Sequence, residues 1–355
     1  MNLNDLRKKI DGLDSQIIEL LNKRARLSID ISKIKLSSGK NSYSPDREKE
    51  VLKKVARVNK GPLKQTAVEA IYREIMSGSL ALAKRPIKVA YLGPEATFTQ
   101  LAALKRFGSQ VEYIDCASIK EEFNEVEKGQ ADYAVVPIEN TTEGVINYTL
   151  DMLIDSDLRI CSEITLPISH NLLAKSSRDK IQKIYSKREV FPQCRNWLIK
   201  HFPCVELIEV SSTSQAAKLA AKIKNSACIA SSLAGKLYNL ETVAANIEDS
   251  TFNITRFLVI GKCDARPTGN DKTSILFSVK DRVGALHDML VPFKKYKINL
   301  TKIESRPSKR KAWEYYFFID LIGHRDDVKV RSALGELEKK CNFLKILGSF
   351  PYAEK

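Results

Sequence analysis

Hydrophobic residues in the first quarter of the chain recur every three or four positions. From Leu6 to Ile34 this spacing predicts one helix of roughly 30 residues with a continuous apolar seam. A single helix cannot cover its own seam, so we expect it to pair with other helices, including those of a second subunit. The polar stretch 37–45 ends this helix, and two more helices are predicted over 45–58 and 63–83.

Near residue 86 the hydrophobic period changes, and short apolar runs alternate with helical segments. This alternation predicts two α/β lobes joined by the extended stretch 159–175, with the strand 256–261 in the second lobe. Two such lobes leave a cleft of the kind that binds small molecules. The last segment has the β-α-β-β-α-β order of a ferredoxin-like α+β domain. The predicted domains are 1–85 (all-helical), 86–263 (two-lobed α/β, like a periplasmic binding protein) and 272–351 (α+β).

Positive charge is concentrated at the start of the chain. The net charge is +15, and residues 1–85 hold 19 Lys and Arg against 10 Asp and Glu, an excess of nine. Such an excess attracts anions, either nucleic acid or small carboxylates. The alternative is a solvated basic surface of the helices. Nucleic acid ranks last, because the cations face a helical seam and are not interleaved with aromatic residues. We expect no nucleic-acid partner.

The remaining composition indicates a reduced, cytoplasmic protein. The seven cysteines form no C-x-x-C pair, no secretory signal is visible at the start, and no apolar run is long enough to span a membrane. Four Asn-x-Thr sequons are therefore not expected to carry sugar. The four histidines lack metal-ligand spacing, and no glycine-rich nucleotide motif occurs, so we expect neither metal nor cofactor.

Cations in the helical segment predict a pocket for a small dianion. Arg24 occupies a seam position where an apolar residue is expected, and a buried Arg is costly unless it is paired. Lys35 lies on the same face, about three turns later, and Arg7 points toward a neighbouring helix. The alternative is a seam Arg that an acidic partner satisfies. The second and third helices add Arg47, Glu48 and Ser79 to the expected pocket.

The fragments DLRKKID, LNKR, KIK, YSPDREKEVL and REIMSGSLAL resemble the all-helical chorismate mutase domain. The resemblance implies that Arg24 and Lys35 are catalytic and that Arg7 crosses a dimer interface. One position departs from the family: Ala83 stands where Gln or Glu is usual, so weak mutase activity is expected unless another side chain substitutes. The substrate-binding residues implied are Arg7, Arg24, Lys35, Ser44, Arg47, Glu48 and Ser79.

Four fragments of the middle segment, GPEATFTQLAAL, VPIENTTEGVINYTLDML, VSSTSQAA and NITRF, together resemble prephenate dehydratase over some 170 residues. The resemblance implies that Thr255 is catalytic, with Glu139 as its expected neighbour. Ala96 replaces a usual glycine, which matters if that turn needs a positive φ. The segment 187–198 also departs and is expected to be structural. The substrate-binding residues implied are Thr97, Asn140, Thr141, Ser212, Thr213, Arg256 and Phe257.

The fragments GALHDML and LTKIESRP in the last segment resemble the ACT domain, a small ligand-sensing module. The resemblance implies allosteric binding of L-phenylalanine, which requires unequal affinity for two states of the protein. The alternative is a plain dimerisation module. The contacts implied are Gly284, Ala285, Leu286 and His287 in the first fragment, and a loop of Glu304, Ser305, Arg306 and Pro307 in the second.

Taken together, the three resemblances cover nearly the whole chain in the order mutase, dehydratase, sensor. They imply a homodimeric or larger bifunctional enzyme that converts chorismate to prephenate and then to phenylpyruvate, with inhibition by phenylalanine. Two rival hypotheses remain: a dehydratase whose helical segment serves only dimerisation, and a non-enzymatic two-lobed binding protein.

Overall fold

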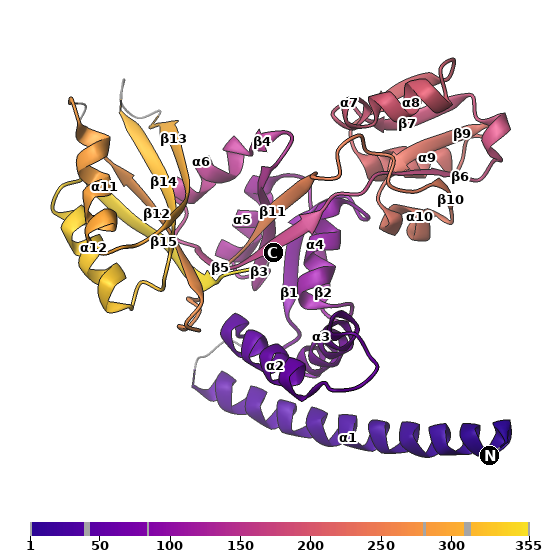
Figure 1. The fold of residues 1–355 in the computed structure, drawn as a ribbon, viewed down its shortest axis with the longest axis horizontal. Coiled ribbons are helices and arrows are strands. Elements are labelled where there is room, and N and C mark those ends of the chain that lie inside the picture. Colours follow the sequence, from indigo (N-terminus) through magenta and orange to yellow (C-terminus); the bar gives the residue numbers. More distant parts are fainter. Residues whose placement is uncertain (1, 39–42, 84, 280–281, 309–313, 354–355) are drawn as a thin grey trace. The chain divides into compact units, whose positions relative to one another are not determined.

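The computed structural model describes residues 2–38, 43–83, 85–279, 282–308 and 314–353 (Figure 1). The chain folds into two compact units. One unit consists of Met1–Lys88 together with Arg106–Glu112, and the other of Val89–Lys105 together with Tyr113–Lys355. The domain limits that we inferred from the sequence remain a prediction.

The first unit is built from the three predicted helices. A capping box fixes the start of the first one: the Asn2 side chain accepts from the backbone N–H of Asp5 (2.9 Å), and Asp5 accepts from that of Asn2 (3.2 Å). The expected break at 37–45 lies partly outside the described residues. The helices are α1 (Leu3–Ser37), α2 (Pro45–Val58) and α3 (Gln65–Ala81).

The seam of α1 is exposed within one chain. Its Leu and Ile side chains are between 42% and 68% exposed, although their spacing is that of a buried face. Burial of each such side chain is worth about 1.5–3 kcal/mol, so a partner surface is favoured. The seam residues with this exposure are Leu6, Ile10, Leu13, Ile17, Leu20, Leu27, Ile31 and Ile34.

The second unit begins with a sheet in the order β2-β1-β3-β11-β5, with β4 paired to β3. Strand β11 was predicted in the second lobe, and this was wrong: it lies between β3 and β5, antiparallel to both (Figure 1). Periodicity identifies a strand but not its partners. The elements are β1 (Lys88–Leu92), α4 (Phe98–Phe107), β2 (Glu112–Cys116), α5 (Ile119–Glu127), β3 (Tyr133–Asn140), β4 (Gly144–Val145), α6 (Asn147–Asp155), β5 (Arg159–Pro167) and β11 (Ile254–Gly261).

The second lobe holds the sheet β10-β6-β9-β7-β8. Strands β5 and β6 confirm the predicted extended crossing between the lobes, because β5 belongs to the first sheet and β6 to the second. The elements are β6 (Asn171–Ala174), a 3-10 turn (Arg178–Lys180), β7 (Lys183–Lys187), α7 (Val190–Gln193), α8 (Arg195–His201), β8 (Glu206–Val210), α9 (Thr213–Ala220), β9 (Ser226–Ala230), α10 (Ser232–Tyr238) and β10 (Glu241–Ala244).

The last segment has the predicted β-α-β-β-α-β order and forms the antiparallel sheet β13-β14-β12-β15. One face of this sheet shares a hydrophobic core with the first lobe: Phe318 and Phe350 cluster with Val136, Leu258 and Ile260. The sensor segment is therefore packed onto the strands of the first lobe. The elements are β12 (Asp271–Ser278), α11 (Ala285–Lys295), β13 (Leu300–Pro307), β14 (Tyr315–Ile322), α12 (Val328–Glu338) and β15 (Phe343–Pro351).

A buried carboxyl in α5 makes the stability of this core dependent on pH. Glu122 is fully buried, and burial raises the pKa of its carboxyl well above the ordinary value of 4.5. The folded state therefore holds Glu122 protonated, and its contribution, complete below pH 4.5, is lost as pH rises toward the folded pKa. We expect the unfolding free energy of Glu122→Gln, relative to the wild type, to grow by up to about 1.4 kcal/mol per pH unit above pH 4.5.

Urea unfolding of both proteins at pH 5, 6 and 7 measures this slope. A difference between Glu122→Gln and the wild type that stays constant over that range would contradict a protonated Glu122. Glu121→Gln, one residue earlier and on the exposed side of α5, is the matched control against which the slope of Glu122→Gln is compared.

Candidate functional site

Thr255 lies in β11 directly opposite Asn140 of β3. The side-chain amide of Asn140 donates to the Thr255 hydroxyl oxygen at 2.7 Å. Its orientation is fixed, because its carbonyl oxygen accepts from the backbone N–H groups of Thr142 (2.8 Å) and Glu143 (3.0 Å). Since the Thr255 oxygen accepts this bond, its own proton remains available for donation to another group.

A row of amide side chains continues from Asn140 into the second lobe. Asn140 also donates to the carbonyl of Asn253 (2.9 Å), and the Asn253 amide donates to the carbonyl of Gln193 (2.7 Å). The Gln193 amide in turn donates to Glu143 (2.8 Å). Each bond fixes the orientation of the next amide, so the row links both lobes beside Thr255.

His170 joins this row through Gln193. Its Nε2 lies 2.9 Å from the Gln193 carbonyl, which can only accept, so the proton of the neutral ring is on Nε2. Burial lowers the pKa of His170, although Gln193 and Glu248 oppose the shift. His170 is therefore neutral at pH 7, and its ring meets Phe98, at the start of α4, edge-on at 5.6 Å.

A cavity of about 310 Å³ opens beside this row. It is lined by Thr142, Glu143, Pro192, Gln193, Glu248, Asp249, Ser250 and Asn253, so the described lining contains no Lys or Arg. Two of the acidic side chains are already occupied by backbone donors: Glu248 accepts from His170, and Asp249 from Asn196 and Trp197.

Sequence reasoning missed Gln193, because segment 187–198 was expected to be structural. The signal that could have identified it was an amide side chain retained within a segment that otherwise departs from the family. Cys194, the next residue, is fully buried in the core of the second lobe.

Glu139 does not lie beside Thr255, and this corrects the expected pairing. In antiparallel strands, paired residues point to the same face and successive residues alternate. Glu139 pairs with Arg256, one position from the Asn140–Thr255 pair, so both side chains point to the opposite face. Arg256 was likewise expected to shape the Thr255 site, and it points away from it.

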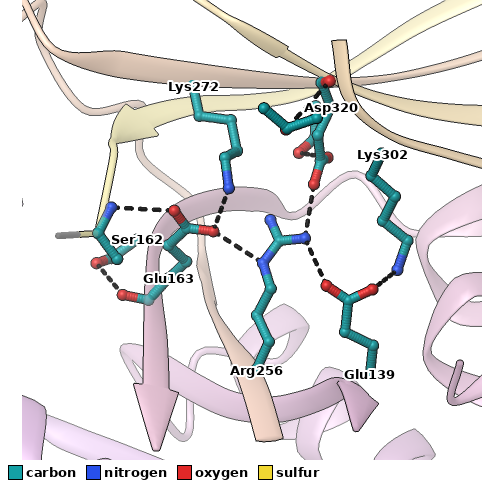
Figure 2. A network of polar contacts seen from close by, with 10 residues as sticks. Glu139, Ser162, Glu163, Arg256, Lys272, Lys302 and Asp320 are labelled. Atoms are coloured by element: carbon teal, nitrogen blue, oxygen red, sulfur yellow. Dashed lines mark hydrogen bonds and ion pairs between the residues drawn. The ribbon is translucent and has the colours of Figure 1, made fainter. Parts of the chain in front are cut away.

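On this opposite face, Arg256 is the centre of an ion-pair network between the dehydratase and sensor segments (Figure 2). Its guanidinium lies 2.6 Å from Asp320 of β14, 2.8 Å from Glu163 of β5 and 3.3 Å from Glu139. Lys302 of β13 also pairs with Glu139, and Lys272 of β12 pairs with Glu163 at 2.9 Å. Strands β3 and β11 are therefore tied electrostatically to the sensor sheet.

The attraction between the opposite charges of this network outweighs the cost of burying them. Burial alone would raise the pKa of Asp320, but Arg256 and the hydroxyl of Ser274 hold it below its ordinary value. Burial would also raise the pKa of Glu139, and Lys302 and Arg256 lower it instead. Both carboxylates are thus ionised at neutral pH.

The other dehydratase residues inferred from the sequence are engaged in local structure. The Thr141 hydroxyl donates to Phe252 and accepts from the Ile254 N–H (2.9 Å), so it anchors the start of β11. Phe257 is buried in the sheet.

Two further predicted residues cap helices. The hydroxyl of Thr97 accepts from the Gln100 N–H at the start of α4, and that of Ser212 accepts from the Gln215 N–H at the start of α9. Thr213 is the buried first residue of α9.

Hydroxyl groups tie the loop before α4 to the starts of α9 and α10. Ser231 donates to the carbonyl of Ala96 (3.0 Å), and Ser214 of α9 donates to the carbonyl of Glu95. Ala96 has φ +66, the conformation that the usual glycine adopts freely. The loop 93–97 is thus hydrogen-bonded to the start of α9, and the start of a helix favours anions.

In the helical unit, the structure joins two of the predicted pocket residues. Arg24 is half-buried and donates to the Ser79 hydroxyl at 2.6 Å. Burial lowers the pKa of the Arg24 guanidinium, and Tyr72 opposes this shift. The positive charge of Arg47 lowers the pKa further, so Arg47 lies close enough to interact electrostatically with Arg24. Lys35 is partly buried near the end of α1, while Arg7 is exposed.

The remaining pocket residues lie on or before α2. Glu48 is buried, and its Oε2 accepts from the Tyr43 hydroxyl at 2.9 Å. Arg47 forms an exposed ion pair with Glu50 (2.6 Å). The Ser44 hydroxyl donates to Asp46 (2.7 Å). Ala83 is buried just beyond α3 and supplies no donor.

The second sensor fragment forms a strand, and this corrects the expected loop. Glu304 to Pro307 belong to β13, which pairs with β14 as far as Pro307 and Tyr315. Alternate side chains of a strand point to opposite faces, so the side chains of Glu304 and Arg306 face away from those of Ser305 and Pro307. Arg306 pairs with Asp151 of α6 at 2.9 Å and so points toward the dehydratase segment.

The first sensor fragment forms the turn before α11. Gly284 has φ +76, Ala285 is the buried first residue of α11, and Leu286 packs against the sensor core. The His287 side chain is 80% exposed and lies 3.5 Å from Asp288.

Two classes of site are absent from the part of the chain that the structure describes. No group of three or more His, Cys, Asp or Glu side chains there is placed to hold a metal ion. None of its helices combines the length and apolar character required to cross a bilayer.

Three family models match the chain in succession. They are "Chorismate mutase type II" over residues 6–84, "Prephenate dehydratase" over residues 89–265 and "ACT domain" over residues 273–339.

Curated relatives match the chain from end to end. A bifunctional chorismate mutase/prephenate dehydratase of Aquifex aeolicus is 51% identical, covering 99% of this chain and 98% of the relative. One from Pseudomonas aeruginosa is 46% identical with the same coverage. Among solved structures, a prephenate dehydratase from Arthrobacter aurescens in complex with L-Phe has a TM-score of 0.71 at 31% identity. That match covers 75% of this chain and 90% of the other.

Proposed function

The chain belongs to the family of bifunctional chorismate mutase/prephenate dehydratases, and we propose the following roles for its residues. The helical unit isomerises chorismate to prephenate, and the two-lobed segment converts prephenate to phenylpyruvate, CO2 and water. The hypothesis of a mutase-dead dimerisation arm is not favoured, since the helical segment matches its own family model and full-length relatives carry both names. The rival reading as a non-enzymatic binding protein is disfavoured on the same grounds.

The hydroxyl of Thr255 acts in the dehydration. The single observation that supports this role is the hydrogen bond that it accepts from Asn140. With its oxygen accepting from Asn140, Thr255 directs its proton to the departing C4 hydroxyl of prephenate. Loss of CO2 supplies the electron pair that expels this hydroxyl as the ring becomes aromatic. The Thr255 proton completes the water, and one proton from solvent restores the Thr255 hydroxyl. Glu139 takes no part in this step, because it lies on the other face of the sheet.

The substrate carboxylates are held mainly by backbone N–H groups. Thr97 and Ser212 mark the starts of α4 and α9, where unpaired N–H groups carry a partial positive charge. The cavity beside Asn253 contributes amides and hydroxyls, and its carboxylates disfavour an anion there. We therefore place the carboxylates toward the two helix starts and the ring toward Thr255.

The mutase reaction is a pericyclic rearrangement, so the pocket holds a compact conformer and stabilises charge on the ether oxygen. Arg24 and Lys35 provide the cations, with Arg47 and Ser79 beside Arg24. The exposed seam of α1 supports a homodimer in which Arg7 reaches the pocket of the second subunit.

Phenylalanine binds the sensor domain and inhibits the dehydratase. Support comes from the ion pairs of Asp320 and Lys302 with Arg256 and Glu139, since these link the sensor sheet to the strands that carry Thr255 and Asn140. The turn at Gly284 and the face of β13 with Ser305 and Pro307 are the proposed ligand contacts. The reduced cysteines fit a cytoplasmic location.

Turnover of the full-length protein tests this function. We expect chorismate to yield prephenate, prephenate to yield phenylpyruvate, and added phenylalanine to suppress the second reaction. The same preparation should sediment as two or more chains. Loss of either reaction in a folded wild-type protein would remove the corresponding half of the proposal.

A further inference from the structure

A short segment beyond the mutase family match folds with the helices. That match ends at residue 84, yet residues 106–112 belong to the helical unit. In this unit Gln110 donates its backbone N–H to the Ser77 hydroxyl (3.0 Å), and the Ser109 hydroxyl donates to Glu74 of α3 (2.7 Å). The segment 106–112 is therefore part of the tertiary structure that surrounds α2 and α3.

Arg106, the first residue of this segment, reaches a predicted pocket residue. Its Nε donates to the Tyr43 hydroxyl at 2.7 Å, and its Nη2 lies 3.4 Å from the Glu48 carboxylate. A guanidinium can only donate, so the Tyr43 oxygen accepts from Arg106 and sends its own proton to Glu48 Oε2. Arg106 therefore donates to Tyr43 and forms an ion pair with Glu48, while Tyr43 donates to Glu48.

The other oxygen of the Glu48 carboxylate is buried and has no hydrogen-bond donor among the described residues. Glu48 is 8% exposed, and its Oε1 has no hydrogen-bond partner among the described residues. A buried carboxylate oxygen left without a donor is costly, which favours a ligand that donates a hydrogen bond. Chorismate carries a hydroxyl besides its two carboxylates, and only the hydroxyl can approach Glu48 without charge repulsion.

We propose that Arg106 is a positioning residue of the mutase pocket. With Tyr43 it holds the Glu48 carboxylate so that Oε1 accepts a hydrogen bond from the hydroxyl of chorismate. The inference rests on the proposed place of Glu48 in that pocket. It follows that the mutase reaction depends on a side chain from the stretch matched by the dehydratase family model.

Steady-state kinetics of full-length variants test this role. We expect Arg106→Met to raise KM for chorismate about tenfold with kcat changed less than threefold, because the bond to Glu48 serves the bound substrate and the transition state alike. Tyr43→Phe should raise KM in the same direction, and Arg106→Lys should recover part of the loss. The double variant Glu48→Gln/Arg106→Met should be no worse than Glu48→Gln alone.

Two controls separate positioning from a folding defect. Ser109→Ala loosens the same segment without touching Glu48 and should leave chorismate KM within twofold of the wild type. Prephenate turnover by each variant should stay at the wild-type rate.

An Arg106→Met enzyme with the wild-type KM for chorismate would overturn the positioning role of Arg106. Additive effects of the two substitutions in the double variant would overturn it as well. Neither result would change the assignment of the mutase pocket. If Glu48→Gln itself leaves chorismate turnover unchanged, the pocket assignment of Glu48 fails, and the inference falls with it.

Discussion

Thr255→Val is expected to lower kcat for prephenate dehydration by about 10²–10³-fold, with chorismate turnover unchanged. Valine keeps the shape of threonine but removes the hydroxyl that accepts from Asn140 and donates to the leaving group. The Asn140 amide keeps its second acceptor, Asn253, so the loss is confined to the reacting centre. Initial rates of phenylpyruvate formation measure the change.

Thr255→Ser is the matched control for this substitution. It retains the hydroxyl and removes only a methyl group, so we expect it to keep dehydratase activity within tenfold of the wild type. Mutase activity in the same preparation reports on folding. A Thr255→Val enzyme that dehydrates prephenate at the wild-type rate would exclude the hydroxyl from the chemistry.

Arg256→Met is expected to reduce the free energy of unfolding by about 3–5 kcal/mol, the typical cost of breaking a buried ion pair by removing one partner. The methionine would leave Asp320 without its ion partner, while Glu163 and Glu139 would keep Lys272 and Lys302. The Arg256 side chain is only 12% exposed, so solvent cannot replace the lost contact. Urea unfolding at pH 7 measures the loss.

The pH dependence of this loss has a definite sign. Arg256 depresses the pKa of Asp320, so the pair stabilises the fold above the unfolded pKa of about 3.9, and this stability is lost as pH falls through the folded pKa. Without Arg256, burial raises that pKa instead. The deficit of Arg256→Met should therefore be largest near pH 7 and shrink toward pH 4.

The control for Arg256→Met is an ion pair of the same kind at the surface. Arg325 pairs with Asp264 at 2.9 Å, but both side chains are about one-third exposed. Arg325→Met should cost less than about 1 kcal/mol. Equal losses for Arg256→Met and Arg325→Met would show that the network around Arg256 contributes no more than a surface pair.

Residue spacing predicted the helices of the first segment, the main strands of both lobes and the β-α-β-β-α-β order of the last segment, but it assigned β11 to the wrong lobe. The period of Leu6 to Ile34 identified α1, and the strand runs and turn residues identified both lobes and the sensor domain, because these depend on local spacing. The sequence also singled out Arg24, and through its family resemblance Asn140 and Thr255, as candidate site residues.

Which side chains meet depends instead on how distant segments pack. Strand β11 belongs to the first sheet, and its register with β3 pairs Thr255 with Asn140. The same register pairs Arg256 with Glu139, whose side chains point to the other face of the sheet. A shift of one residue in that register would have reversed this outcome, and no local pattern encodes it. The contact of Arg106 with Glu48 joins residues 58 positions apart for the same reason: packing, unlike periodicity, is a property of the whole fold.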